Sequence, residues 1–483
     1  MREKLIAIGL DLGTGGARAV AMDFQGQMIA EGRADFPVAA SRVDGPRVEQ
    51  SPQAWTTAAE TALRELASGL PAGHQIVGLA VDATSGTFLL ADEDDQPLTP
   101  GVMYNDLRAT DQAKEAAEAV RQTLAPYGIE VAAAFALPKL VWFARHEPDV
   151  FRRCRRVVHQ TDWIVGRLCG RYDVTDVSTA LKTGVEPATL QWPEAIESRL
   201  GIPRSLLPEV VLPGTPIGQL TGDAAAATGL PVGTPIVAGC TDGTAGCLAS
   251  GAKQRGDLNV TLGTTLVFKA ISAQPLLDPA GAIYNHRHPA GGFLPGAAST
   301  TGGEWIGMHL AGQDLDALGR RAARRLPSGH IAYPLVKTGE RFPFACPTAT
   351  GFGLEQLADP AERFAAGMEG VAFLERLGIE RLEQLGLDVG PTVYATGGGV
   401  AGETWLRIRA AVNGRAYCTP RYPQCAVGAA VLAAMPHEGG SARAVAAIVR
   451  PGQTVEPDPA LVEAYTQPRE RFLAALRERG YVR

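Results

Sequence analysis

The chain contains the same local pattern twice, and this repetition constrains its fold more than any other feature. An apolar segment, Leu5–Leu10, is followed by a Gly-rich turn and a second apolar segment, Ala17–Met22. In the second half, Asp257–Lys269 runs in the same order, and its Leu262-Gly-Thr264 repeats Leu12-Gly-Thr14. Each copy predicts strand, tight turn and strand. We therefore expect an internally duplicated α/β protein. The chain does not begin with a Rossmann unit, because such a unit would continue from its first strand through a loop into a helix.

Helical and extended segments alternate along the rest of the chain. Apolar residues at helical spacing predict helices over residues 51–66, 109–125, 138–145, 160–168, 363–377 and 403–413, and an amphipathic helix beyond residue 460. Short apolar runs predict strands at 75–81, 235–239 and 392–395. Residues 187–235 are rich in Pro and Gly and lack long periodic runs, which is typical of a loop-rich connection.

The length of the chain predicts more than one domain. A chain of 483 residues exceeds what a single compact core usually covers. The hydrophobic fraction of 46% and the charged fraction of 20% are ordinary for a globular α/β protein. We expect an N-terminal domain over residues 1–234, a second domain over 235–440, and a helical tail over 441–483 that packs on the fold.

The charge balance and the cysteines indicate the kind of partner. Lys and Arg number 45 against 51 Asp and Glu, and this net charge of −6 argues against nucleic acid or an anionic membrane as partner. The seven cysteines form no Cys-x-x-Cys pair, and the apolar run at 426–435 is too short to span a membrane. We expect a cytoplasmic protein that binds small molecules, and we leave its oligomeric state open, with a homodimer as one option.

Each Gly-Thr turn offers backbone N–H groups and a threonine hydroxyl, which together suit the clamping of phosphate oxygens. One such turn is more often structural, but a turn in each half favours two turns that face a shared cleft. Asp11 directly follows the first strand, where burial of a carboxylate is costly unless it is paired or binds a metal. We therefore expect Asp11 to coordinate Mg²⁺, directly or through water.

Asp242 lies between an apolar strand and a helix of small residues. The N-terminus of a helix favours an ionised carboxylate, because its free N–H groups and its dipole are positive. As a functional residue, Asp242 would accept the proton of a substrate hydroxyl during phosphoryl transfer. The alternative is a plain N-cap with no chemical role.

The stretch Thr396–Gly402 formally matches the Gly-x-Gly-x-x-Gly fingerprint of dinucleotide-binding proteins. No Asp or Glu for a ribose follows about twenty positions later, in residues 417–425, and no N-terminal βαβ unit is predicted. A Gly run between strand and helix can equally let the backbone approach an adenine or an α-phosphate. The chain also lacks a Walker A sequence, so any ATP must be held without a P-loop. An NAD-dependent dehydrogenase rests on this one match.

Two polar clusters in the first half suit recognition of a polyhydroxyl compound. They are Val81-Asp-Ala-Thr-Ser-Gly86, at the end of a strand, and Tyr104-Asn-Asp-Leu-Arg108, after a Pro-Gly turn. A sugar needs several converging carboxylate, amide and hydroxyl partners, because an unpaired partner penalises the wrong stereoisomer. For Asp106 and Arg108, a surface ion pair of little energetic weight is the alternative.

An ordered series of motifs resembles the FGGY family of carbohydrate kinases over residues 6–434. Asp11-Leu-Gly-Thr14 is similar to the family's opening phosphate loop, and Asn105-Asp-Leu-Arg108 to its sugar-binding segment. The other matching segments are Gln160–Leu168 with Asp173–Asp176, Cys240–Thr244, Leu262–Thr265, Gly397–Gly399 and Ala426–Ala430. Each motif alone is unspecific, and it is their order that identifies the family.

The resemblance implies two actin-like (ribonuclease H-like) ATPase domains that flank a cleft. It implies transfer of the ATP γ-phosphoryl group to a sugar hydroxyl with Asp242 as catalytic base. The residues implied for the nucleotide and Mg²⁺ are Asp11, Thr14, Gly15, Thr264, Thr265, Gly398, Gly399 and Trp405, and those for the sugar are Asp82, Ser85, Asp106 and Asp242.

The sequence of Val81–Thr87 is most similar to that of the D-ribulokinase and xylulokinase-like branch of the family, and glycerol kinase is less similar. We therefore expect a ketopentose as substrate, D-ribulose first, with D-xylulose or a pentitol as the alternative. Tyr104 stands where the family often has Trp, and Gly402 where it often has a polar residue. A different class also stays open, an actin-like ATP-dependent switch protein without sugar kinase activity.

Overall fold

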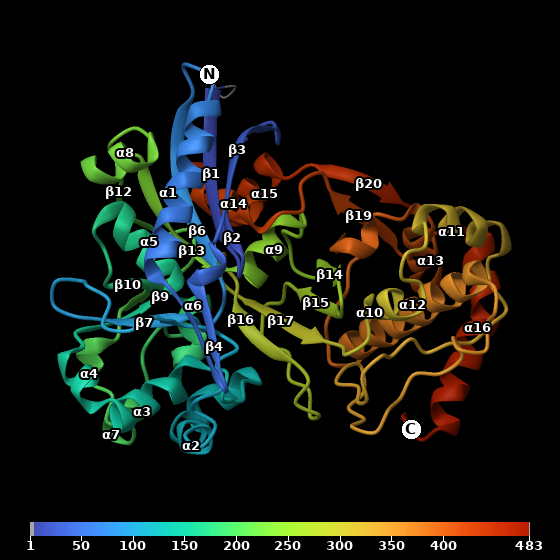
Figure 1. Ribbon diagram of the computed structural model, residues 1–483. Helices are drawn as coiled ribbons and strands as arrows, with labels where there is room; N and C mark the ends of the chain where they lie inside the picture. Colours follow the sequence, from blue (N-terminus) through green and yellow to red (C-terminus); the bar gives the residue numbers. More distant parts are fainter. Residues whose placement is uncertain (1–3, 483) are drawn as a thin grey trace. The chain divides into compact units, whose positions relative to one another are not determined.

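The computed structural model describes residues 4–482, which form two compact units (Figure 1). The first unit contains the chain up to Ala249 together with His286–Gly292 and Gln424–Arg450. The second contains Ser250–Asn285, Phe293–Pro423 and the residues from Pro451 onward. The chain therefore leaves the first unit three times and returns to it twice.

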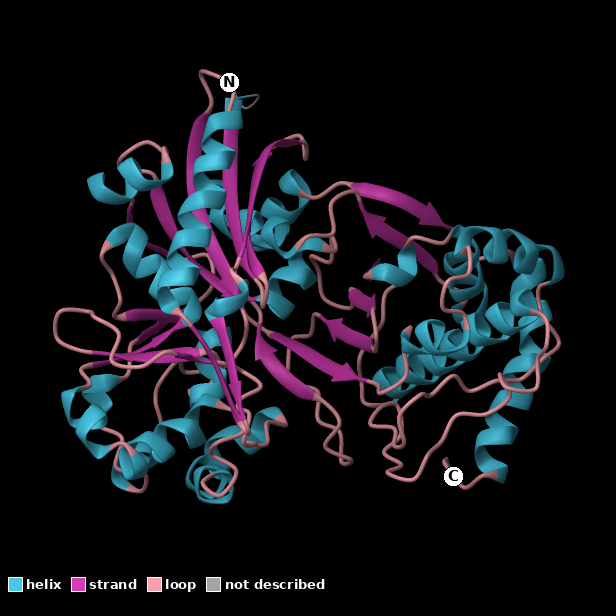
Figure 2. Cartoon of the chain, in the orientation of Figure 1, coloured by secondary structure: helices cyan, strands magenta, loops and turns pink. Residues whose placement is uncertain are grey.

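A six-stranded sheet forms the centre of the first unit (Figure 2). The three middle strands are parallel, and the strands beyond them on each side run antiparallel to their neighbours. In spatial order the strands are β12 (Pro216–Gln219), β13 (Pro235–Thr241), β6 (Gln75–Ala83), β1 (Leu5–Leu12), β2 (Gly16–Asp23) and β3 (Met28–Asp35).

Helices pack on this sheet at close range. α1 (Pro52–Gly69) begins at Ser51, whose hydroxyl accepts the N–H of Ala54. α14 (Cys425–Glu438) packs on β1, β6 and α9 (Asp242–Ala249). A Cβ at Gly9 of β1 would lie 1.8 Å from the carbonyl oxygen of Ala426, so only glycine lets α14 lie on the strand. The apolar run at 426–435 is thus a core helix, and within residues 4–482 no helix is long and apolar enough to cross a membrane.

A second layer of the first unit carries further polar segments. Its five-stranded sheet has the order β4 (Ser41–Asp44), β5 (Arg47–Gln50), β8 (Gly101–Val102), β7 (Phe88–Ala91) and β9 (Arg156–His159). A parallel pair, β10 (Val174–Asp176) and β11 (Glu209–Val211), lies apart from it. The remaining helices of this unit are α2 (Ala113–Leu124), α3 (Ala136–His146), α4 (Pro148–Arg153), α5 (Gln160–Cys169), α6 (Val177–Ala180), α7 (Glu194–Ser198), α8 (Gly222–Thr228) and α15 (Ser441–Ile448).

The second unit repeats the strand pattern of the first. Its seven-stranded sheet begins with β16 (Tyr284–Arg287) at one edge. Six strands follow in the order β17 (Phe293–Ala298), β15 (Leu266–Ala270), β14 (Leu258–Leu262), β18 (Thr392–Thr396), β19 (Ala416–Pro420) and β20 (Pro451–Val455). The parallel and antiparallel pairings match strand for strand those of β3-β2-β1-β6-β13-β12. This match confirms the expected duplication. β16 (Tyr284–Arg287) belongs partly to each unit.

Long helices cover the sheet of the second unit. α13 (Glu403–Asn413) packs against α12 (Pro360–Gln384) and against the C-terminal helix α16 (Pro459–Glu478). Phe472 of α16 lies fully within this core, against Phe373 of α12. Two shorter helices, α10 (Glu304–His309) and α11 (Leu315–Ala322), complete the unit.

Most predicted elements occur within a few residues of their expected limits, but the units divide differently from the expected domains. β13 pairs with β6 in the first sheet, so the boundary lies after residue 249 rather than 234. Residues 424–450 also return to the first unit, and the tail from Pro451 belongs to the second. Residues 187–235, expected to be a loop-rich connection, contain the short elements α7, β11, β12 and α8.

Candidate active site

Three carboxylates gather at one edge of the first unit's sheet. Asp11 near the end of β1 lies opposite Asp82 of β6 in the parallel register. Asp82 in turn lies opposite Cys240 of β13, and Asp242 begins α9 directly after that strand. The carboxyl ends of parallel strands meet at one edge of a sheet, which is where ligands bind in open α/β folds.

Burial and the neighbouring negative charges disfavour the ionised forms of Asp82 and Asp11. Asp82 is fully buried, and neither of its oxygens accepts a hydrogen bond from the described residues. The Asp11 carboxyl adjoins it, and a protonated Asp82 would donate to that carboxyl. Burial, followed by the negative charge of Asp11, raises the pKa of Asp82 well above its ordinary value. Burial also raises the pKa of Asp11, against which the charge of Arg18 acts in the opposite direction. A cation at this edge would relieve the excess of negative charge.

The donor set fits a magnesium ion that keeps most of its water. Within residues 4–482, no three His, Cys, Asp or Glu side chains lie close enough to hold a metal ion by themselves. Mg²⁺ is usually bound through one or two carboxylates, with water and substrate phosphate completing its octahedron. Asp11, which is partly exposed, has Asp82 behind it and suits such a role.

The first Gly-Thr turn presents its backbone openly. Gly13 N–H donates to Gly16 O at 3.0 Å, which closes the turn. Thr14 and Gly15 are exposed, and the Gln50 side chain holds the turn from behind by donating to Thr14 O at 2.9 Å. A Cβ built on Gly13 or Gly15 would meet nothing within 4 Å, so open space adjoins this backbone. The turn can therefore accommodate an anionic group.

The backbone beside Asp242 is anchored by Ser178, which no predicted motif includes, and by Asp176, which ends a predicted motif but had no expected role. Thr241 N–H donates to the Ser178 hydroxyl at 3.1 Å, and that hydroxyl donates to Asp176 at 2.5 Å. Asp176 is 2% exposed, and burial raises its pKa to about 6. The Asp242 carboxylate is half-buried and accepts Gly243 N–H at 2.6 Å. No local sequence pattern predicts that α6 packs against β13.

Two lysines contact the backbone of the two polar clusters or of their flanks, Lys182 at Ser85 and Lys139 at Met103. The Ser85 hydroxyl is buried without a hydrogen-bond partner among the described residues, while its carbonyl oxygen accepts Lys182 Nζ at 3.0 Å. Lys139 is fully buried and donates to Met103 O at 2.7 Å. Burial lowers the pKa of Lys139 to about 7. Neither lysine stands in a motif, so neither was foreseen from the sequence.

Asp106 and Arg108 form an ion pair, but a buried one. Their side chains are 0% and 4% exposed, so the surface pair weighed as the alternative is wrong about burial. Asp106 also accepts Val48 N–H at 2.7 Å, and Arg108 donates to Glu49 at 2.7 Å. The oxygens of Asp106 are therefore occupied within the protein. Its expected contact with a sugar remains a prediction.

In the second unit, the second Gly-Thr turn and the Gly loop after β18 pack on each other. A Cβ at Gly397, where φ is 87°, would lie 2.4 Å from Leu262 O. A Cβ at Gly399 would lie 2.2 Å from the Leu262 side chain. Thr264 and Gly398 remain exposed. The close approach joins the two expected nucleotide-binding segments in one place, with Thr265 at the base of the turn.

Trp405, expected near the adenosine, lies in the core of the second unit. Its side chain packs against Trp305, with ring centroids 6.3 Å apart, and its indole N–H donates to Met368 O at 3.2 Å. The residue is 5% exposed. Its position supports a packing role under the N-terminal turn of α13, and a direct contact with adenine stays a prediction.

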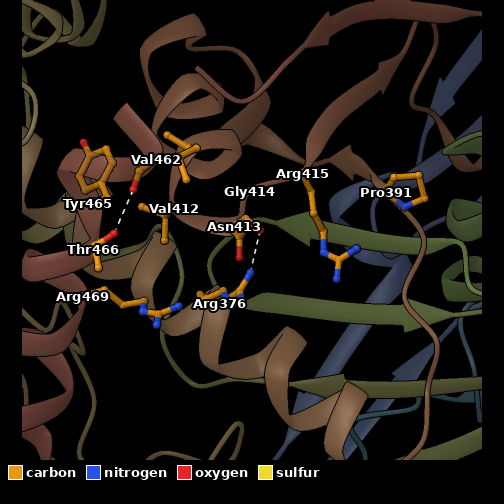
Figure 3. Close-up of a pocket in the computed structure, with 11 residues that line it drawn as sticks. Arg376, Pro391, Val412, Asn413, Gly414, Arg415, Val462, Tyr465, Thr466 and Arg469 are labelled. Atoms are coloured by element: carbon orange, nitrogen blue, oxygen red, sulfur yellow. Dashed lines mark hydrogen bonds between the residues drawn. The ribbon is translucent and has the colours of Figure 1, made fainter. Parts of the chain in front are cut away.

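A separate cavity of about 460 Å³ lies between α12, α16 and the end of α13 (Figure 3). Its polar lining includes the three arginines Arg376, Arg415 and Arg469. Arg376 and Arg469 both pair with Glu380, at 2.8 and 3.3 Å, while Arg415 pairs with Glu383. The guanidinium groups are thus held within the unit, and none of the expected site residues lines this cavity.

Two family models match the chain over almost its whole length. Residues 6–249 match the N-terminal domain of the FGGY family of carbohydrate kinases, and residues 258–437 match its C-terminal domain. The chain belongs to the FGGY family of carbohydrate kinases. It is therefore an ATP-dependent sugar kinase with two actin-like domains, and neither the switch protein nor the dehydrogenase is supported.

Several known kinases are similar to this FGGY kinase over most of its length. A xylulose kinase of Escherichia coli K12 is 28% identical over 443 residues, covering 88% of this chain and 89% of its own. An autoinducer-2 kinase of E. coli is 26% identical and covers 98% and 94% of the two chains. The solved xylulose kinase of Rhodospirillum rubrum is 28% identical, with a TM-score of 0.83 and 98% coverage of both chains.

Proposed function

We propose that this kinase transfers the γ-phosphoryl group of ATP to a terminal hydroxyl of a ketopentose. The observation that carries the proposal is the edge where Asp11, Asp82 and Asp242 meet, in a chain of the carbohydrate kinase family. D-Ribulose is favoured by the wording of Val81–Thr87. D-Xylulose is the second candidate, because several similar proteins are named xylulose kinases.

In the proposed reaction, Asp242 acts as general base. Its carboxylate takes the proton of the terminal hydroxyl while the hydroxyl oxygen forms a bond to the γ-phosphorus. The bond from the γ-phosphorus to the bridging oxygen breaks, and ADP leaves with that oxygen. The hydrogen bonds from Ser178 to Asp176 and from Thr241 to Ser178 hold the strand end that carries Asp242.

The remaining site residues bind and orient. Thr264, Thr265, Gly398 and Gly399 are proposed to contact the nucleotide, with Thr14 and Gly15 at its phosphates. Asp11, supported by Asp82, would hold Mg²⁺, which supplies charge neutralisation at the phosphate oxygens. Ser85, Asp82 and Asp106 are proposed on the sugar side, and we add Lys182, because it donates to Ser85 O.

Coupled measurement of ADP release over D-ribulose, D-xylulose, ribitol, xylitol, glycerol and sedoheptulose tests the proposal. We expect one ketopentose to exceed glycerol in kcat/KM by at least tenfold, since a site built for several hydroxyls leaves polar groups unpaired when one is missing. A pentitol as the best acceptor would correct the substrate class. No turnover with any of the six would overturn the assignment.

A further inference from the structure

Glu340 is a buried carboxylate that joins four residues of the second unit. The residue is 3% exposed. It accepts the backbone N–H groups of Thr300 and Thr301, and the Thr301 hydroxyl at 2.7 Å. It also accepts the Tyr333 hydroxyl at 2.8 Å and the backbone N–H of Arg341 at 2.9 Å. The two oxygens of a carboxylate offer about four acceptor sites, so one side chain can serve all of these donors.

The segment that Glu340 holds lies directly against the second Gly-Thr turn. Gly303 N–H donates to Gly263 O at 2.7 Å, and Leu266 N–H donates to Thr301 O at 3.0 Å. A Cβ at Gly302 would lie 2.4 Å from Thr264 O, so no space separates the segment from the turn. The turn therefore takes its position from Ser299–Gly303.

A second contact fixes the same segment from its other end. Arg341, next to Glu340 in sequence, donates from its guanidinium to Ser299 O at 2.6 Å. The Ser299 hydroxyl donates to Thr301 O and also accepts Leu266 N–H at 3.1 Å. The consecutive residues Glu340 and Arg341 thus both hydrogen-bond to the Ser299–Gly303 segment, although about 40 positions separate them from it in sequence.

We propose that Glu340 is a positioning residue that sets nucleotide affinity by holding Ser299–Gly303 against the Gly263–Thr265 turn. The proposal rests on the proposed role of that turn at the ATP phosphates. A backbone turn binds phosphate well only when its N–H groups are already oriented, because ordering them on binding weakens the affinity. Glu340 would supply this order without touching the nucleotide.

Glu340→Gln keeps the size of the side chain and tests its charge. The new NH₂ group faces donors on whichever oxygen it replaces, so part of the segment loses its acceptor. We expect the Kd of Mg-ADP, titrated by fluorescence without sugar, to rise at least tenfold. The KM for the ketopentose should stay within about twofold of wild type.

Glu369→Gln is the matched control. Glu369 is another buried glutamate of the same unit, 1% exposed, and it accepts Ser328 N–H at 2.8 Å, the Ser328 hydroxyl at 2.5 Å and the Tyr465 hydroxyl at 2.9 Å. It makes no contact with the turn or its supporting segment in the described hydrogen bonds. We expect this variant to lower Tm as much as Glu340→Gln while the Kd of Mg-ADP stays within twofold.

The outcomes separate this proposal from the proposed function. Equal Mg-ADP affinity in Glu340→Gln and wild type, or equal weakening in Glu369→Gln, overturns the positioning role. Thr301→Val removes only the hydroxyl donor and provides a milder test, with about threefold weakening expected, should Glu340→Gln not accumulate as folded protein. Because ADP binding is measured without sugar, a failed ketopentose screen leaves this result intact.

Discussion

The two units share one strand pattern but differ in the chemistry at equivalent positions. In the register, Asp11 of the first unit corresponds to Thr261 of the second, since each precedes a Leu-Gly-Thr turn. Their strand neighbours are Asp82 and Thr396 respectively. A carboxylate pair in one unit therefore stands where a hydroxyl pair stands in the other.

The hydroxyl pair is satisfied within the protein and the carboxylate pair is not. Thr261 and Thr396 share a hydrogen bond of 2.7 Å, and the Asn259 side chain donates to Thr396 at 3.2 Å. Asp82, in contrast, is buried against a like charge. Strained titratable groups mark functional sites more often than satisfied ones. The two copies of the duplicated fold thus keep the same strand arrangement, while only the first has a pair of carboxylates at this position.

The largest effect is expected at Asp242. Asp242→Asn removes the proposed base, and general-base catalysis contributes about 10²- to 10⁴-fold to rate. We expect kcat with the best ketopentose to fall by that factor while the Kd of Mg-ADP changes little. Asp223→Asn, an exposed aspartate in the first turn of α8, is the control and should keep full activity. Near-full activity of Asp242→Asn would remove it as the base.

A paired substitution tests the comparison between the units directly. Asp82→Asn should lower kcat about 10- to 100-fold, because a charged hydrogen-bonding group contributes about 1.5–3 kcal/mol. Thr396→Val, at the equivalent position, should change kcat less than about threefold. Steady-state kinetics of both variants at varied Mg²⁺ decide the matter. Equal effects of the two substitutions would break the distinction between a charged and a neutral unit.

The pH dependence of stability sharpens the same point. The native pKa of Asp82 lies above that of the unfolded chain, so the native state binds more protons in the interval between the two values. The unfolding free energy of wild type should therefore fall as pH rises through that interval. Asp82→Asn should lack this fall and be the more stable protein at neutral pH without Mg²⁺, as urea unfolding measures.

The two Gly-Thr turns offer a smaller effect. Removal of one neutral hydrogen bond costs about 0.5–1.5 kcal/mol, which is about a 2- to 12-fold change in affinity. We expect Thr264→Val to raise the KM for ATP by a factor in this range. Thr14→Val should act in the same direction if both turns serve the phosphates. An unchanged KM for ATP in both variants would leave the turns a structural role only.

The smallest effect on activity is expected at Asp176, whose signature is in stability. Its native pKa of about 6 exceeds the ordinary 3.8, so the stability that protonation confers is complete below pH 3.8 and lost as pH rises through about 6. The difference amounts to about 3 kcal/mol. Urea unfolding of Asp176→Asn between pH 4 and 7 should show a flatter profile than wild type. An identical slope would refute the titration of this group.

Local features of the fold were predictable because they depend on short stretches of sequence. The helix over 403–413 was predicted at its observed limits, and both hairpins formed where the Gly-Thr turns indicated. Periodicity and turn residues act over a few positions, so their signals survive in any context. The order of the motifs also sufficed to identify the family, which the family models confirm.

The division into units was not predictable in the same way. β13 pairs with β6 across about 160 residues, and α14 packs on β1 across more than 400 residues. Such pairings depend on register and on close backbone approach. Nothing in the sequence around Gly9 indicates that Ala426 packs directly against it. No local pattern states which distant segment will fill that space.

The sequence by itself determined the elements, the duplication and the residue types available for phosphoryl transfer. Only the tertiary structure decided which of them are buried, paired or left unsatisfied, as it did for Asp82, Asp106, Trp405 and Glu340. The physical reason is that hydration and hydrogen bonding depend on neighbours in space. A carboxylate has the same composition everywhere, but its energy is set by what surrounds it.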